Sequence, residues 1–224
     1  IVPAGTTYTW AAPVVTGGMT GGAAGTNQPN ITGTLTNPTN VPQTATYTVT
    51  PTSGSCTGST FTVTVTVNPR PSINNMTTSI CSEGTFTVTP ANGVNGIVPA
   101  GTTYTWGAPA VTGGITGGAA GSGANITGTL TNPTNSPQTA TYTVTPVSGS
   151  CTGANFTVTV TVNPKPAINN MTGTTCSGAA FTVTPVNVTN GIVPAGTTYT
   201  WAAPVVTGGM TGGAAGTNQP NISG

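Results

Sequence analysis

A strand-like segment that ends in a proline-rich joint occurs twice, and it limits the fold more than any other feature. Residues 61–71 read FTVTVTVNPRP, and residues 156–166 read FTVTVTVNPKP. Apolar and threonine side chains alternate with a period of two, which is typical of a β-strand with one buried face. The prolines then end the strand, because proline lacks an amide donor and fixes φ. The sequence therefore predicts domains joined by stiff linkers.

The segment belongs to a longer repeat. IVPAGTTYTW begins at Ile1, Ile97 and Ile192, so the periods are 96 and 95 residues. Such a unit is too long for a solenoid repeat and suits one β-sandwich per repeat. Residues 192–224 match residues 1–33 at all but one position, whereas the copy that begins at Ile97 differs more. We therefore infer two repeat types that alternate along the chain.

The joints divide the chain into three predicted domains: residues 1–70, 71–165 and 166–224. The joint residues are Pro69, Arg70, Pro71, Pro164, Lys165 and Pro166. The first domain lacks the first strands of a repeat, the second is complete, and the third lacks the last strands. We expect the sequence to be a window of a longer repetitive polypeptide.

The complete repeat is expected to be all-β, with about seven antiparallel strands and no helix. The predicted strands are residues 72–80, 86–90, 102–106, 125–132, 139–146 and 156–162, with short edge strands within residues 108–124. Large aromatic residues recur in the predicted strands, and they are expected to fill the core. These core residues are Trp10, Trp106, Trp201, Tyr47 and Tyr142.

Charge is almost absent, which excludes several functions. The charged residues are Arg70, Glu83 and Lys165, and there is no histidine or aspartate. Two basic residues cannot form the footprint that nucleic acids require, and no apolar run is long enough for a membrane helix. Acid–base and nucleophilic catalysis lack carriers, so no catalytic residue is predicted. No cofactor or metal ligand set is predicted either.

The cysteines predict a disulfide within the complete repeat, between Cys81 and Cys151. The alternative pair, Cys56 with Cys81, would cross a joint and require two strands to fold back on each other. The first turn and last hairpin lie at opposite ends of a simple immunoglobulin-like sandwich, so the predicted bond requires a short or displaced first strand. Cys56 and Cys176 would pair with cysteines outside this sequence. Such bonds indicate an oxidising, extracellular environment.

The repeat resembles a known family in a string of motifs that covers the whole chain. The motifs are VNPxP, CSxGxFTVTP, IVPAGTTYTW, TLTNPTNxPQTATYTVTP and GSCTGxxFTVTVTVNP. They are similar to the PKD-like repeats of giant surface proteins in Bacteroidota. The resemblance implies tandem immunoglobulin-like sandwiches in cell-surface adhesins or gliding filaments, exported by the type IX secretion system. The sequence departs from many PKD-related domains in its near absence of acidic residues.

The first functional hypothesis is therefore a segment of an extracellular fibre or adhesin stalk that spans distance and bears load. Its partners would be further copies of the repeat in the same chain, with lateral or head-to-tail self-association through exposed strand edges. The alternative is a glycan- or surface-binding module that uses the loops of the sandwich. An exposed tryptophan would favour the alternative, and a buried tryptophan the first hypothesis.

Overall fold

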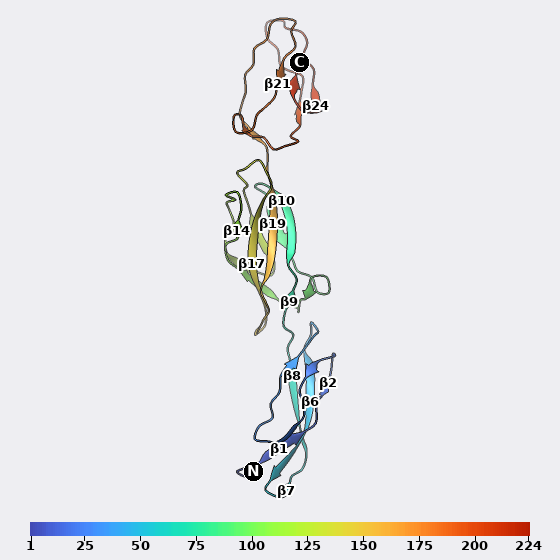
Figure 1. Cartoon of the computed structure of the whole chain (residues 1–224). Coiled ribbons are helices and arrows are strands. Elements are labelled where there is room, and N and C mark those ends of the chain that lie inside the picture. Colours follow the sequence, from blue (N-terminus) through green and yellow to red (C-terminus); the bar gives the residue numbers. More distant parts are fainter.

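The structure, a computed structural model, describes residues 1–224 as three bodies that follow one another along one axis (Figure 1). We label them by the predicted boundaries: unit 1 is residues 1–70, unit 2 is residues 71–165, and unit 3 is residues 166–224. Every regular element is a strand, and no helix is long and apolar enough to cross a membrane. The predicted all-β class is confirmed.

Unit 2 shows the complete set of strands. They are β9 (Ser72–Ile73), β10 (Met76–Cys81), β11 (Thr85–Val88), β12 (Gly96–Ile97), β13 (Thr103–Trp106), β14 (Ala110–Val111), β15 (Gly121–Gly123), β16 (Ile126–Thr129), β17 (Gln138–Ser148), β18 (Cys151–Thr152) and β19 (Phe156–Asn163). The predicted first strand, residues 72–80, is split into two. The break is at Asn74 and Asn75, where the Asn75 Oδ1 accepts the amide of Thr157 at 2.9 Å. As a result β9 pairs with β12, and β10 pairs with β19.

The larger sheet of unit 2 is built around β17, in the order β10-β19-β17-β13-β15, and β14 and β18 also pair with β17. β17 and β19 are antiparallel, with Val144 opposite Phe156. β10 and β19 are parallel, with Cys81 opposite Asn163. The prediction of a purely antiparallel sandwich is therefore wrong for this pair. The reason is that the chain enters and leaves the unit in the same direction along the axis (Figure 1).

A second layer covers one face of this sheet. β11 and β16 form a separate two-stranded sheet, and Phe86 of β11 packs on Tyr142 of β17 with ring centroids 5.4 Å apart. Alternate side chains of β19 are buried, as its period of two predicts. The core between the layers contains Phe86, Val88, Tyr104, Trp106, Ile115, Ile126, Leu130, Ala140, Tyr142, Val144, Phe156, Val158, Val160 and Val162.

Unit 1 repeats the larger sheet without the first strands. Its strands are β1 (Thr7–Trp10), β2 (Val14–Val15), β3 (Thr20–Gly21), β4 (Gly25–Gln28), β5 (Leu35–Thr36), β6 (Gln43–Ser53), β7 (Cys56–Thr57) and β8 (Phe61–Val67). β6 takes the central place of β17 and pairs with β1, β2, β7 and β8. No strand in unit 1 corresponds to β9, β10 or β11, so β8 pairs on one side only.

Unit 3 contains the first strands of the repeat but no counterpart of β17, β18 or β19. Its strands are β20 (Ala167–Ile168), β21 (Thr182–Val183), β22 (Gly191–Ile192), β23 (Tyr199–Trp201), β24 (Gly216–Gln219) and β25 (Ile222–Ser223), and they form three two-stranded sheets. The segment that corresponds to β10, residues 171–176, is not a strand. Its partner in unit 2 is β19, and unit 3 has no such strand.

Candidate functional site at the joints

The first joint is packed against unit 2. Pro69 and Pro71 are buried, and the Arg70 Nε donates a hydrogen bond of 2.7 Å to the carbonyl oxygen of Thr152. A Cβ atom at Gly153 would lie 2.4 Å from the Pro71 carbonyl oxygen, so only glycine permits this approach. The linker is therefore fixed to the base of unit 2 by apolar packing and by the hydrogen bond that Arg70 donates to Thr152.

The second joint is tied to the opposite end of unit 2. The Lys165 Nζ donates to the Glu83 Oε2, and these side chains are 59% and 60% exposed. Glu83, through this hydrogen bond and its charge, raises the pKa of Lys165. Pro164 is half-buried and Pro166 is exposed. Because the ion pair is exposed, salt screens it and it contributes little to stability.

All three charged side chains of the protein thus lie at the joints. Arg70 and Lys165 occupy the same position of the repeat, and Glu83 lies in the turn that follows β10. Elsewhere the outer faces of the sheets are covered by threonine. Cross-strand hydroxyl pairs such as Thr85 with Thr129 (2.8 Å) satisfy these polar groups within the sheet. Thr–Thr pairs of this kind each contribute roughly 0.2–1 kcal/mol.

Two buried polar residues near the second joint were not predicted from the sequence. Ser82 and Asn132 are both buried. The Asn132 Nδ2 donates to the carbonyl oxygens of Ser136 and Val162, at 2.8 Å each. The backbone amide of Asn132 donates to the Ser82 Oγ at 2.9 Å. These bonds connect the turn after β10, the loop of residues 132–136 and the end of β19. The signal was present, because both NPTN and CS recur in the repeat.

The predicted core tryptophans do not form a binding surface. Trp10 and Tyr47 are buried in unit 1, Trp106 and Tyr142 are buried in unit 2, and Trp201 is half-buried in unit 3. The Trp10 indole donates to the Ala23 carbonyl oxygen at 3.0 Å. The Nε1 atom of Trp106 is buried without a partner. No tryptophan of the two units that contain the central strand is exposed for stacking on a sugar.

The predicted Cys81–Cys151 disulfide is not formed, and this prediction requires correction. Cys56, Cys81, Cys151 and Cys176 are all free thiols. Cys81 lies at the end of β10 opposite Asn163, whereas Cys151 pairs with Ser148. In the β17–β19 ladder these points lie beyond opposite ends. The bond required a short or displaced first strand, but β10 pairs with β19 along its full length.

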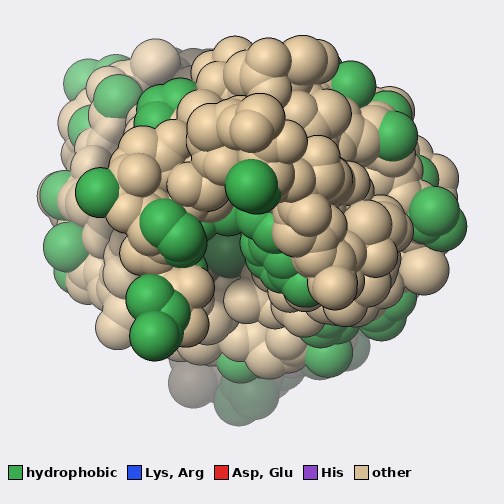
Figure 2. All heavy atoms as spheres, turned by 90° about the horizontal axis from the view of Figure 1, so that it is seen from below, with side chains coloured by type: hydrophobic (Ala, Val, Ile, Leu, Met, Phe, Trp, Pro, Cys, Tyr) green, Lys and Arg blue, Asp and Glu red, His purple; other side chains and the backbone are tan.

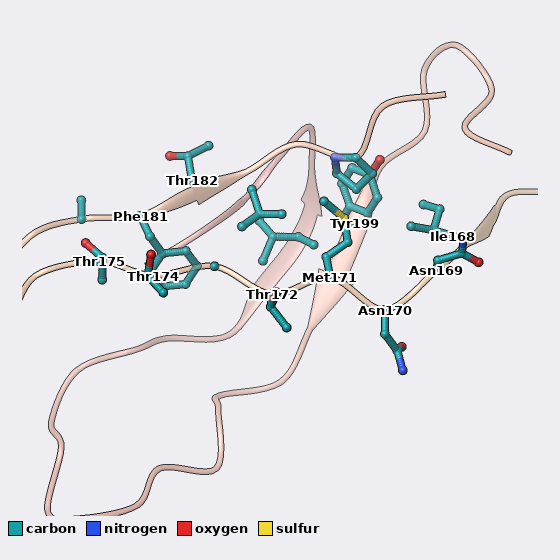
Figure 3. A pocket seen from close by; sticks show the side chains of 15 residues that line it. Ile168, Asn169, Asn170, Met171, Thr172, Thr174, Thr175, Phe181, Thr182 and Tyr199 are labelled. Atoms are coloured by element: carbon teal, nitrogen blue, oxygen red, sulfur yellow. The ribbon is translucent and has the colours of Figure 1, made fainter. Parts of the chain in front are cut away.

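A hollow with a volume of about 790 Å³ lies in unit 3. Met171, Phe181 and Tyr199 point into it (Figure 3). In unit 2 the corresponding Met76, Phe86 and Tyr104 pack on the core that β17 and β19 complete. The hollow is therefore the place of the central strands, and its apolar lining is not evidence of a ligand site.

A second hollow of about 420 Å³ lies at the free end of unit 1, between Tyr8, Pro51 and Phe61. Figure 2 views the molecule from this end and shows hydrophobic side chains around a depression. In unit 2 the backbone of Pro71 occupies the matching place beside Gly153. The first hollow therefore corresponds to the central strands, and the second corresponds to the joint that precedes a unit. No group of three or more histidine, cysteine or acidic side chains is placed to hold a metal ion.

The comparisons with known proteins agree with the repeat structure. The sequence model of the PKD-like domain matches twice, over residues 1–71 and residues 78–166, which together make up more than half of the chain. No curated protein matches the chain.

Proposed function

Because the chain belongs to the PKD-like domain family, we propose that it is a structural segment of a long extracellular fibre or adhesin stalk. The family supports a structural or adhesion module, and such domains are typically extracellular and without catalytic activity. The fibre would span distance and bear load through tandem copies of the unit. Resemblance of its motifs to surface proteins of Bacteroidota adds export by type IX secretion to the proposal.

The observation that carries the proposal is the placement of consecutive units end to end (Figure 1). The parallel pairing of β10 and β19 means that the chain enters each unit at one end and leaves at the other. Each added repeat therefore lengthens the molecule along its axis and does not widen it. The packing of Pro71 on Gly153 and the contact from Arg70 to Thr152 restrict bending at the joint.

The surface suits close packing of fibres. Outside the joints the units carry no charge, so neighbouring copies do not repel each other. The larger sheet of unit 2 ends in β10 and β15, and the outer edges of these strands are open to pairing with another chain. We propose lateral or head-to-tail association of copies on this basis. No observation favours the glycan-binding alternative, because the tryptophans of units 1 and 2 are buried.

The test is to lengthen the chain and measure its shape. Residues 192–224 match residues 1–33 almost completely, so a copy of residues 34–224 joined after Gly224 continues the repeat in register. We expect the maximum dimension from small-angle X-ray scattering to grow linearly, by about 40 Å per unit, because 11-residue strands such as β17 span about 36 Å.

The matched control replaces the two prolines of every joint by glycine and leaves every strand unchanged. This control should grow more slowly with repeat number, because flexible linkers increase their end-to-end distance only as the square root of length. A wild-type series whose dimension does not increase linearly would contradict the fibre proposal.

A further inference from the structure

The two cysteine positions of the repeat lie at opposite ends of a unit, and each lies at a joint. Cys81 ends β10, opposite Asn163, which directly precedes the second joint. Cys151 begins β18 and is followed by Thr152, whose carbonyl oxygen accepts the hydrogen bond from Arg70 of the first joint. The upper end of one unit therefore carries one cysteine position, and the lower end of the next unit carries the other.

The basic residue of each joint contacts a residue close to one of the two cysteine positions. Lys165 contacts Glu83, two residues after Cys81, in the unit that precedes its joint. Arg70 contacts Thr152, one residue after Cys151, in the unit that follows its joint. Since Arg70 and Lys165 are the same position of the repeat, one basic residue lies between the two cysteine-bearing turns in a continuous fibre.

A crevice at the first joint brings the same positions together. It has a volume of about 360 Å³ and is lined by Asn68 of unit 1 and by residues 148–150 of unit 2, next to Cys151. Asn68 is the counterpart of Asn163, and Asn163 is the register partner of Cys81. A strand that paired with β8 as β10 pairs with β19 would place its cysteine at this crevice, facing Cys151.

We infer that consecutive repeats are linked by a disulfide across each joint, between the Cys81 position of one repeat and the Cys151 position of the next. The first joint of the present chain holds Cys151 alone, and the second holds Cys81 alone, so neither has its partner here. The bond differs from both pairs considered from the sequence. It rests on the proposed tandem arrangement, but its test measures thiols instead of length.

Formation of each bond removes two electrons and two protons from two thiols. The electron acceptor is a thiol oxidoreductase that carries a reactive disulfide. The thiolate of Cys81 attacks one sulfur of that disulfide, and the expelled thiolate takes up a proton. The thiolate of the second cysteine then attacks the Cys81 sulfur of the mixed disulfide, which forms the cross-joint bond and releases the oxidant as a dithiol.

The bonds would change how tension passes along the fibre. Cys56 and Cys81, like Cys151 and Cys176, are 25 residues apart. If every joint is linked, these short segments and the disulfides form one continuous covalent path along the fibre. The other residues of each unit lie outside this path. A unit that unfolds under tension would then add little length, since most of its residues lie inside a closed loop.

The test extends residues 1–224 by a copy of residues 34–70, which completes unit 3 and adds a second copy of Cys56 at the second joint. Each protein is oxidised with a dithiol oxidoreductase in its disulfide form, whose second cysteine releases any unpaired thiol from the mixed disulfide. The protein is then treated with a maleimide that labels free thiols, followed by peptide mass spectrometry. We expect Cys81 and the added cysteine to be protected in the extended chain. In the 224-residue chain, Cys81 is labelled.

Single substitutions identify the pair. Cys81→Ser should expose the added cysteine to the maleimide, whereas Cys151→Ser and Cys176→Ser should leave the protection unchanged. Far-ultraviolet circular dichroism of each variant shows that it is folded. Labelling of Cys81 in the extended chain equal to that in the 224-residue chain overturns the inference. Protection that depends on Cys151 or Cys176 also overturns it, because the bond would then lie within one repeat.

Discussion

Strands β8 of unit 1 and β19 of unit 2 share the sequence FTVTVTV, yet they are not equally buried. Phe61 of β8 is 40% exposed and its counterpart Phe156 is 2% exposed. Val65 is 37% exposed, whereas Val160 is fully buried. Both strands pair with a long central strand in the same antiparallel register. The difference therefore does not arise from the strand or from this partner.

The cause is the presence of β10 and β11 in unit 2. β10 covers the second edge of β19, and Ile80 and Met76 pack on the core. β11 brings Phe86 over Tyr142. Unit 1 has no such strands, and its core contains 5 buried residues against 14 in unit 2. The strands that follow one joint thus determine how deeply the strand before the next joint is buried.

The largest expected effect tests this comparison directly. Phe156→Ala should destabilise unit 2 by about 3–5 kcal/mol, the usual range for a buried phenylalanine. Phe61→Ala should cost unit 1 only about 1 kcal/mol, because much of that ring is already in water. Hydrogen exchange of β19 and β8 amides, followed by mass spectrometry, measures the two losses in one chain. Equal losses would show that β10 and β11 do not close the core.

The same pair of variants in an extended chain is the control. A copy of residues 71–96 placed before Ile1 continues in register, because the IVPAGTTYTW motif begins at both Ile1 and Ile97. It supplies unit 1 with counterparts of β9, β10 and β11. In that background the cost of Phe61→Ala should rise to the range expected for Phe156→Ala. An unchanged cost would locate the cause elsewhere.

The sequence alone predicts most strands of unit 2, because their apolar residues alternate cleanly and turn residues separate them. It does not predict the direction of β10. Alternation fixes which side chains face the core, but it is the same for parallel and antiparallel pairing. The split at Asn75 also escaped prediction, since it depends on a hydrogen bond to Thr157, which is distant in sequence.

The joints could be predicted only in part. The prolines indicate a stiff linker, but the contact between Pro71 and Gly153 joins residues far apart in sequence. The cysteines were paired within one repeat because the alternative pair, Cys56 with Cys81, would cross a joint, whereas the register places Cys81 and Cys151 beyond opposite ends of the β17–β19 ladder. The sequence pattern places the first turn and the last hairpin at opposite ends of the sandwich, but it does not show whether the first strand is displaced. Only the register shows that β10 pairs with β19 along its full length.

A smaller effect is expected where the joint touches unit 2. In Gly153→Ala the new methyl group would lie 2.4 Å from the Pro71 oxygen, so the joint must move, at a cost of about 1–3 kcal/mol. Gly58 is the matched position of unit 1, where the nearest atom to a new Cβ is Pro51 Cγ at 3.0 Å. Gly58→Ala should therefore cost less than about 1 kcal/mol.

Urea unfolding of each variant measures the stability change, and hydrogen exchange of residues 71–81 reports the joint itself. Exchange should increase in Gly153→Ala and remain unchanged in Gly58→Ala. If both variants behave alike, the proline packing does not fix the joint, and the difference between the units lies only in their cores.

The smallest expected effect concerns the phenol of Tyr142, a polar group that the tightly packed core of unit 2 buries. Its hydroxyl is buried without a hydrogen-bond partner, and burial raises its pKa above the ordinary value, as it does for Tyr104. At neutral pH, Tyr142→Phe should change stability by no more than about 1 kcal/mol, because it removes an unsatisfied polar group.

The direction of the expected change in stability with pH follows from the raised pKa of Tyr142. A raised pKa means that folded unit 2 holds the phenol proton more tightly than the unfolded chain does. Stability is therefore fully present below the unfolded value, near 10, and falls as the pH rises through the folded value. Tyr142→Phe should weaken this alkaline loss and leave the share due to Tyr104. Urea midpoints of unit 2 at pH 8 and above pH 10 measure it, and an unchanged alkaline loss would show that the Tyr142 phenol reaches water through the sandwich.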